Sequence, residues 1–220
     1  FTSDLGRDVR GREPSAVFTA FSDLSAFTEK PIAPLPAQPT VVFVGSLEPY
    51  KNIAGLGEAW RRMSERQSDA KLVIVGRGSQ HHVVQRLVAD FPDRVEHHEW
   101  LDPPAVAEVL DDATVLVLPS WPEGLGRVVI EAFARGRAVI ATDAGGIPDL
   151  VTHEREGLLV PPADPVTLAE ALERVLGDRE LAERMGRAAH RRYADWDTTP
   201  EELARHMRAL VDSAVAGTAR

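Results

Sequence analysis

The sequence predicts an α/β protein built on a parallel sheet with helices on both faces. From residue 41 onward, short apolar runs alternate with longer segments of helical period, a pattern typical of strand-helix-strand units. Three of the runs are almost continuously apolar, as expected of strands that helices cover on both sides. With 220 residues, the chain is long enough for one large domain with a substantial buried core.

The individual elements follow from these runs in order. The apolar runs predict strands at residues 41–44, 71–75, 95–98, 114–118, 138–141 and 157–160. The intervening segments predict helices near residues 53–67, 80–90, 104–111, 125–135 and 165–176. The last helix is well marked, because Asp164 can cap it and Pro165 fits its first turn. Its apolar stripe consists of Leu168, Leu172, Val175 and Leu176.

The two ends of the chain are expected to lie outside these units. Two further helices, near residues 179–192 and 200–215, extend the domain without adding a strand. Residues 31–39 are too rich in proline for a helix or a central strand and are expected to form an extended linker. The first 30 residues are expected to lie outside the core, as the tail of an upstream domain. The domain limits are therefore placed at residues 1–39, 40–195 and 196–220.

Composition excludes several kinds of protein. The chain has no cysteine, so it can form neither disulfides nor thiolate metal sites. Its net charge of -9 argues against a nucleic acid as a partner, because nucleic-acid binders carry a basic face. No apolar run approaches the roughly 18 residues of a membrane span, and residues 1–8 lack a secretory pattern. We therefore expect a cytoplasmic protein, with the inner face of the membrane as the alternative location.

Parallel sheets of this kind bind ligands beyond the carboxyl ends of their strands, where helix N-termini present free N–H groups. The loops predicted to lie there are residues 45–51, 76–78, 100–102, 120–126 and 142–146. Small residues recur in them, which allows a ligand to approach the backbone closely.

The loop from Glu123 to Gly126 stands out among these five. It directly follows an apolar strand and directly precedes a helix, so the amides near Gly124 to Arg127 should bind an anion such as phosphate. Glu131 comes about two helical turns later and could face the same cleft. Two carboxylates beside a phosphate site are good acceptors for sugar and ribose hydroxyls, which indicates a nucleotide sugar. Taken without the loop, two glutamates eight positions apart would more often be solvated helix charges.

Four segments, taken together and in order, carry a resemblance to a known family. Glu123-Gly-Leu-Gly-Arg-Val-Val-Ile-Glu131 resembles the Glu-x7-Glu motif of the group 1 glycosyltransferases. Gly45-Ser-Leu-Glu-Pro-Tyr-Lys-Asn52 resembles that family's Gly-x-Leu-x-x-x-Lys-Gly/Asn loop. Val73-Ile-Val-Gly-Arg-Gly78 is similar to its Val-Gly-x-Gly turn, and Gly145-Gly-Ile-Pro-Asp149 to its Gly-Gly-x-x-Glu/Asp segment. The resemblance covers about residues 15 to 195.

This resemblance implies the C-terminal, donor-binding half of a GT-B fold, a Rossmann-like domain of about six strands with extra C-terminal helices. Glu131 would then hold the ribose hydroxyls, Glu123 would contact hydroxyls of the transferred sugar, and Lys51 would neutralise the diphosphate. Lys51 and Glu123 are the implied catalytic residues. The implied donor-binding set is Gly45, Ser46, Lys51, Gly76, Arg77, Leu101, Glu123, Gly124, Leu125, Gly126, Arg127, Val128 and Glu131.

The chain departs from the family pattern at the second diphosphate cation. The family often has an arginine one residue after the loop glycine or just before the lysine, where this chain has Ser46 and Tyr50. Arg77 and Arg127 are the two candidates to replace it. In the resemblance, the loop at Trp100 lines the base pocket, but we favour core packing for the Trp100 side chain.

Other chemistries fit less well. Gly76-Arg-Gly78 lacks the third glycine of a dinucleotide-binding fingerprint and follows the second strand of the domain. The adjacent pairs His81-His82 and His97-His98 do not have the spacing of a zinc site. No metal and no cofactor are expected.

The sequence therefore predicts a metal-independent glycosyltransferase domain that transfers a sugar, with retention, from a UDP-, GDP- or ADP-sugar. The acceptor, a sugar or small molecule, would be bound by an N-terminal domain, so this chain alone would be inactive. The helix at 200–215 would pack toward that domain, and its exposed stripe would otherwise promote self-association. The rival hypothesis is a module that binds a nucleotide or nucleotide sugar and catalyses nothing.

Overall fold

The structure, a computed structural model, describes residues 23–218, and the predicted α/β fold is confirmed in it. Within that range six parallel strands form one sheet in the order β3-β2-β1-β4-β5-β6. This is the strand order of the doubly wound Rossmann fold. The strands are β1 (Thr40–Val44), β2 (Lys71–Val75), β3 (Val95–His98), β4 (Val115–Leu118), β5 (Ala138–Thr142) and β6 (Gly157–Val160).

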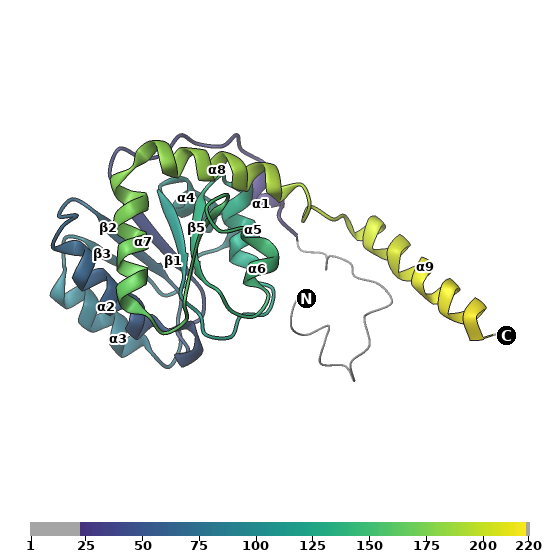
Figure 1. Cartoon of the computed structure of the whole chain (residues 1–220), viewed down its shortest axis with the longest axis horizontal. Helices are drawn as coiled ribbons and strands as arrows, with labels where there is room; N and C mark the ends of the chain where they lie inside the picture. The colour runs from purple at the N-terminus through teal and green to yellow at the C-terminus, as the bar shows by residue number, and fades with distance from the viewer. Residues whose placement is uncertain (1–22, 219–220) are drawn as a thin grey trace.

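Helices form a layer on each side of the sheet (Figure 1). In one layer α2 packs against α3 and α7, and in the other α5 packs against α1 and α8, with α1 also contacting α4. The helices are α1 (Ser25–Thr28), η1 (Pro49–Lys51, a single 3-10 turn), α2 (Ile53–Ser64), α3 (His81–Asp90), α4 (Pro103–Asp111), α5 (Arg127–Ala134), α6 (Ile147–Leu150), α7 (Pro165–Gly177), α8 (Arg179–Tyr193) and α9 (Pro200–Thr218). The short elements α1, η1 and α6 were not predicted.

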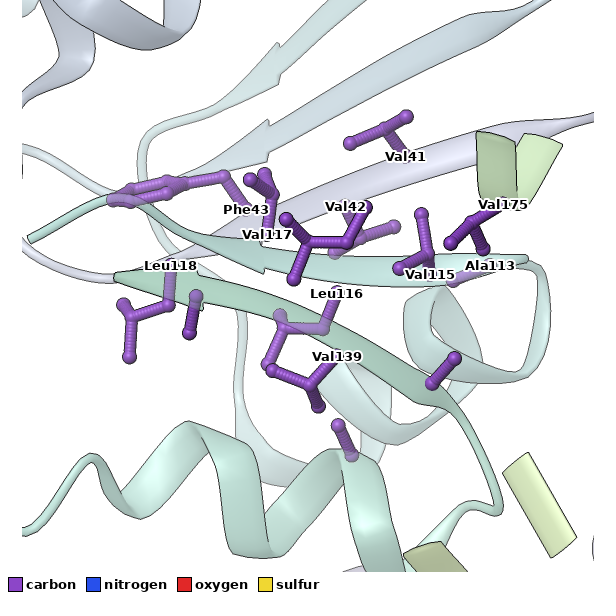
Figure 2. Packing of buried hydrophobic residues seen from close by; sticks show 14 of the residues in the cluster. Val41, Val42, Phe43, Ala113, Val115, Leu116, Val117, Leu118, Val139 and Val175 are labelled. Atoms are coloured by element: carbon purple, nitrogen blue, oxygen red, sulfur yellow. The ribbon is translucent and has the colours of Figure 1, made fainter. Parts of the chain in front are cut away.

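The core lies between the central strands and these two layers. Every residue of β4 and β5 is buried, as the continuous apolar runs predict. Figure 2 shows side chains of β1, β4 and β5 packed together with Val175 of α7. The α7 prediction is confirmed in detail: the Asp164 side chain accepts hydrogen bonds from the N–H groups of Val166 and Thr167, and Pro165 begins the helix.

The order in which the chain adds strands to the sheet reverses between β1 and β4. These two strands are hydrogen-bonded neighbours, but the connection from β1 leads to β2 on one side and the connection from β4 leads to β5 on the other. The two loops therefore diverge at the carboxyl ends of β1 and β4. In this fold a ligand binds in the crevice that such a divergence creates.

The expectation that the first 30 residues lie outside the core is wrong for the part that the structure describes. Leu24 and Phe27 belong to the core cluster and are 4% and 2% exposed. Arg135 donates hydrogen bonds to the carbonyl oxygens of Phe27, Lys30 and Pro31, which fixes this segment to the start of β5. Residues 31–39 form neither helix nor strand, as predicted. Residues 1–22 lie outside the described range.

The helix α9 extends away from the sheet and its covering layers (Figure 1). Its apolar side chains Met207, Val211 and Val215 are exposed. Among residues 23–218, no helix combines the length and apolar character that a membrane crossing requires.

Candidate functional site

The loops after β1 and β4 meet directly at the point where the strand order reverses. Lys51, in η1, donates a hydrogen bond from Nζ to Oε2 of Glu123, in the loop after β4. Ser120 Oγ donates to the same carboxylate oxygen over 3.0 Å. The side chains of Lys51 and Glu123 are each 12% exposed, so this ion pair is largely removed from solvent. The two implied catalytic residues, far apart in sequence, are thus brought into contact.

The local backbone explains why these loops take this shape. The Trp121 N–H donates to the Tyr50 carbonyl oxygen over 2.8 Å, which joins the two loops. Asn52 follows Lys51 with a positive φ of 55°, a conformation that glycine and asparagine adopt most readily. This accounts for Gly/Asn at that place in the family motif. The Asn52 side chain also accepts a hydrogen bond from the Gly55 N–H and so caps α2.

Glycines allow the strand-end loops to pack backbone against backbone. A Cβ at Gly76 would lie 1.8 Å from the Gly45 carbonyl oxygen, and one at Gly145 would lie 2.1 Å from the Glu123 carbonyl oxygen. The Gly146 N–H donates to that same Glu123 oxygen over 2.9 Å. The position of Glu123 is therefore set by the glycine pair that the sequence identified at residues 145 and 146.

The N-terminus of α5 has free hydrogen-bond donors. The helix is preceded by Gly126 with a φ of 60°. The N–H groups of residues 124–128 donate no hydrogen bond to any residue within the described range. Such donors, together with the helix dipole, favour an anion. The side chains of Leu125 and Val128 are partly buried and pack against the core.

Glu131 lies on the second turn of α5 and is 9% exposed. Arg127 Nε lies 2.9 Å from its Oε1, an i,i+4 ion pair along the helix. Burial raises the pKa of Glu131, and the Arg127 charge and hydrogen bond oppose that shift. Arg127 also donates from Nη2 to the Asp23 carbonyl oxygen over 3.0 Å, so its guanidinium contacts two separate groups. The i,i+4 spacing made this pairing predictable from the sequence.

A pocket of about 320 Å³ lies beside these loops, across the carboxyl ends of β1, β2 and β3. Five predicted residues from the first three strand-end loops line it together with Trp100; these are Gly45, Ser46, Gly76, Arg77 and Leu101. Trp100 is 66% exposed, so the prediction that it packs in the core is wrong. The reason is that the Trp100 loop follows the short edge strand β3, where no further element covers it.

Ser120 and Trp121 belong to this site but were missing from the predicted set. Ser120 is fully buried beneath Glu123, and its carbonyl oxygen accepts a hydrogen bond from Thr142 Oγ1. Trp121 is 46% exposed on the loop that bears Glu123. Their place directly after a buried strand was the available signal. In the described part of the chain, no three His, Cys, Asp or Glu side chains gather in a way that could hold a metal.

Comparisons with known proteins show similarity to glycosyltransferases. The family model described as "Glycosyl transferases group 1" matches residues 38–178. A D-inositol 3-phosphate glycosyltransferase of Jonesia denitrificans is 35% identical over 186 residues, which cover 76% of this chain and 42% of that protein. This chain thus spans less than half the length of that relative.

Two solved structures illustrate the similarity of fold. A sucrose-phosphate synthase from Thermosynechococcus elongatus superposes with a TM-score of 0.72 at 31% identity, over 91% of this chain and 50% of that one. Anabaena HepE in complex with UDP-glucose superposes with a TM-score of 0.70 at 21% identity, over 80% of this chain and 49% of that one. At 21% identity the likeness to HepE shows the fold alone.

Proposed function

The chain belongs to the group 1 glycosyl transferases, and on that premise we propose that it binds a nucleoside diphosphate sugar and serves in transfer of the sugar to an acceptor. The observation that carries this proposal is the contact between Lys51 and Glu123 across the reversal point of the sheet. A cation, a sugar-hydroxyl acceptor and the donor-rich start of α5 thereby lie at one crevice. No cofactor or metal is part of the proposal.

The diphosphate is proposed to bind Lys51 and the free N–H groups of residues 124–128. When the bond between the anomeric carbon and the diphosphate oxygen breaks, negative charge develops on the leaving diphosphate. Donors already fixed at that place stabilise the developing charge without having to reorganise. Because the charge is greater in the transition state than in the bound donor, they lower the barrier more than they tighten binding.

The two carboxylates are proposed to hold different hydroxyls of the donor. Glu123 would accept from the transferred sugar, because it lies beside Lys51 and therefore beside the leaving group. Glu131 lies further along α5 and would accept from the ribose. A carboxylate is an acceptor with about four lone-pair sites, so Glu123 can accept from Lys51, Ser120 and a sugar hydroxyl at once.

The base is proposed to enter the 320 Å³ pocket, where the backbone at Gly76 and the side chains of Trp100 and Leu101 would face it. HepE was solved with UDP-glucose, which makes uridine the first base to test. The choice among UDP, GDP and ADP, and of a hexose as the transferred sugar, belongs to this proposal.

The acceptor is proposed to be bound by an N-terminal domain, with residues 40–195 as the donor domain and 196–220 packing toward the N-terminal one. The basis is that this chain matches only 42% of its Jonesia relative. Retention of configuration, absence of a metal and a cytoplasmic location are proposed from the family resemblance. On this view the chain binds donor but does not complete transfer alone.

Calorimetric titration with UDP, GDP and ADP, without added metal, tests the proposal. We expect one diphosphate to bind, and Lys51→Ala and Glu131→Ala each to weaken it by about 1 kcal/mol or more, as expected for lost charge-assisted hydrogen bonds. Lys30→Ala is the matched control, because Lys30 forms an exposed pair with Glu108 away from the crevice. Thermal unfolding of each variant verifies that it is folded.

Two results would contradict the proposal. One is that no diphosphate binds to this chain and that none binds to a protein that also carries the proposed acceptor domain. The other is that a diphosphate binds and both substitutions leave its affinity unchanged.

A further inference from the structure

The two ion pairs at the crevice leave it without net positive charge. Lys51 is paired with Glu123, and Arg127 is paired with Glu131, so the two pairs cancel. The diphosphate of a nucleotide sugar carries two negative charges near neutral pH. The N-terminus of α5 adds the equivalent of only about half a positive charge. A donor diphosphate would therefore need a further cation.

The positions where the family resemblance places such a cation are neutral in this chain. Ser46 Oγ and the Tyr50 hydroxyl lie 3.3 Å apart and hydrogen-bond to each other. Arg127, the candidate nearest to the Glu-x7-Glu motif, is held by the Glu131 carboxylate and the Asp23 carbonyl oxygen. Moving its guanidinium to a phosphate would leave a largely buried carboxylate without its partner, which is costly.

Arg77 differs from Arg127 in that its guanidinium is exposed and holds no other group of the described residues in place. It lies in the turn after β2 and lines the 320 Å³ pocket together with Gly45 and Ser46 of the Lys51 loop. Its side chain is exposed, and within residues 23–218 it forms no hydrogen bond or ion pair through its guanidinium. Of the described residues that line this pocket, Arg77 is the one cation.

The backbone of Arg77 is nevertheless fixed relative to the Lys51 loop. The Leu47 N–H donates to the Arg77 carbonyl oxygen over 2.9 Å, and the Gly45 N–H donates to the Val75 carbonyl oxygen over 3.0 Å. The close approach of Gly76 to the Gly45 carbonyl holds the same turn from the other side. The guanidinium of Arg77 can thus move, whereas the backbone of Arg77 is held in place.

We propose that Arg77 supplies the second cation for the donor diphosphate, in addition to Lys51, and that Arg127 instead holds Glu131 in place. This inference rests on the proposed function, since it concerns the same site. A guanidinium can donate two parallel hydrogen bonds to phosphate oxygens. Its contribution should appear for diphosphates and not for the nucleoside part of the ligand.

The test compares diphosphates with monophosphates, using the pairs UDP and UMP, GDP and GMP, and ADP and AMP. For the base that binds, we expect Arg77→Ala to weaken the diphosphate about tenfold and the monophosphate much less, which lowers the preference for the diphosphate. Arg77→Lys should restore part of that preference, because the charge returns without the two parallel donors. Arg86→Ala, at an exposed arginine of α3, should change neither affinity.

The other variant is Arg127→Leu, which removes the partner of Glu131. It should weaken the binding of diphosphate and monophosphate alike, and so leave the preference for the diphosphate unchanged. The inference is overturned if Arg77→Ala weakens both ligands equally, if it changes neither, or if Arg127→Leu alone abolishes the preference. If neither the unchanged chain nor a protein that also carries the proposed acceptor domain binds any of the six nucleotides, the proposed function fails and the inference fails with it.

Discussion

The amino ends and the carboxyl ends of the strands are called here the amino edge and the carboxyl edge of the sheet. A buried cation lies at each of them, and the two cations differ in how many of their hydrogen-bond donors are used. At the amino edge, Arg135 is 1% exposed and donates five hydrogen bonds, two to the Asp111 carboxylate and three to carbonyl oxygens. A guanidinium has five N–H donors, so this one is fully used. At the carboxyl edge, Lys51 has three donors and uses one of them within the described range, to Glu123. Burial of charge is common to both edges, but Arg135 uses all five of its donors and Lys51 uses one of its three.

Cavity size does not separate the two edges. A pocket of about 380 Å³ lies at the amino edge, between the segment at Ile32 and helix α8, and it is larger than the pocket of about 320 Å³ beside Lys51. Arg137 lines the larger pocket, but its guanidinium donates to the carbonyl oxygens of Leu110, Ala33 and Asp111. The comparison of Arg135 with Lys51 therefore says more about the candidate binding edge than cavity volume does.

The largest effect expected from this comparison is on stability, at Arg135. Arg135→Met removes five hydrogen bonds and leaves the Asp111 carboxylate and three carbonyl oxygens without that donor. We expect the free energy of unfolding to fall by about 3–5 kcal/mol, as for other buried pairs that lose one partner. Urea unfolding measures it. Arg174→Met, which breaks the exposed pair with Glu154, should cost less than about 1 kcal/mol.

Nucleotide binding provides the second half of that test. The folded Arg135→Met protein should bind its diphosphate as the unchanged chain does, because Arg135 lies at the opposite edge. A stability loss below about 1 kcal/mol, or a loss of affinity in molecules that remain folded, would contradict the division between a structural edge and a binding edge.

A smaller effect is expected at Gly145, where the carboxyl edge is held by backbone contact. Gly145→Ala places a methyl group 2.1 Å from the Glu123 carbonyl oxygen, at a φ of 61° that alanine adopts with strain. We expect a loss of about 1–3 kcal/mol in unfolding free energy, together with weaker diphosphate binding because Glu123 is displaced. Chemical unfolding measures the change in unfolding free energy, and calorimetry measures the change in diphosphate affinity. Gly177→Ala, at the end of α7, meets only Gln67 and should be neutral or stabilising; equal effects at both glycines would refute the argument.

Most of the fold could be predicted from the sequence, because its strands are apolar runs and its helices carry local start signals such as Asp164 and Pro165. The elements that were missed, α1, η1 and α6, have three or four residues each, too few to show a helical period. The burial of Leu24 and Phe27 depends on carbonyl acceptors that meet Arg135 only in the folded chain.

The candidate site could be predicted in its membership but not in its contacts. The resemblance named Lys51, Glu123 and Glu131, but the Lys51–Glu123 pair exists because β1 and β4 are neighbours, which no local pattern reveals. The exposure of Trp100 likewise depends on β3 being the edge strand. For Arg127 the i,i+4 spacing to Glu131 was a signal in the sequence, but its second partner, the Asp23 carbonyl oxygen, is seen only in the folded chain.

The smallest effect expected is a pH dependence at Glu131. Burial raises the pKa of this carboxyl above its ordinary value of 4.5, although Arg127 opposes the shift. The folded chain therefore keeps the proton to a higher pH than the unfolded chain does, so ionisation of Glu131 disfavours folding as the pH rises through and above about 4.5. Glutamine cannot ionise. Relative to the unchanged chain, Glu131→Gln should thus gain unfolding free energy as the pH is raised from about 4 to about 7.

An opposite trend is expected at Glu154, which makes it the matched control. The hydrogen bond from Arg174 lowers the pKa of Glu154, so its ionised form favours folding above its unfolded pKa, and that contribution is lost as the pH falls. Glu154→Gln should therefore lose unfolding free energy relative to the unchanged chain over the same rise in pH. Urea unfolding of the three proteins at both pH values measures the two trends. If Glu131→Gln followed Glu154→Gln in sign, the Arg127 charge would outweigh burial at Glu131. The ionised form of Glu131 would then be favoured by its arginine partner, and an ion pair with an arginine would stabilise the fold at the carboxyl edge as one does at Asp111.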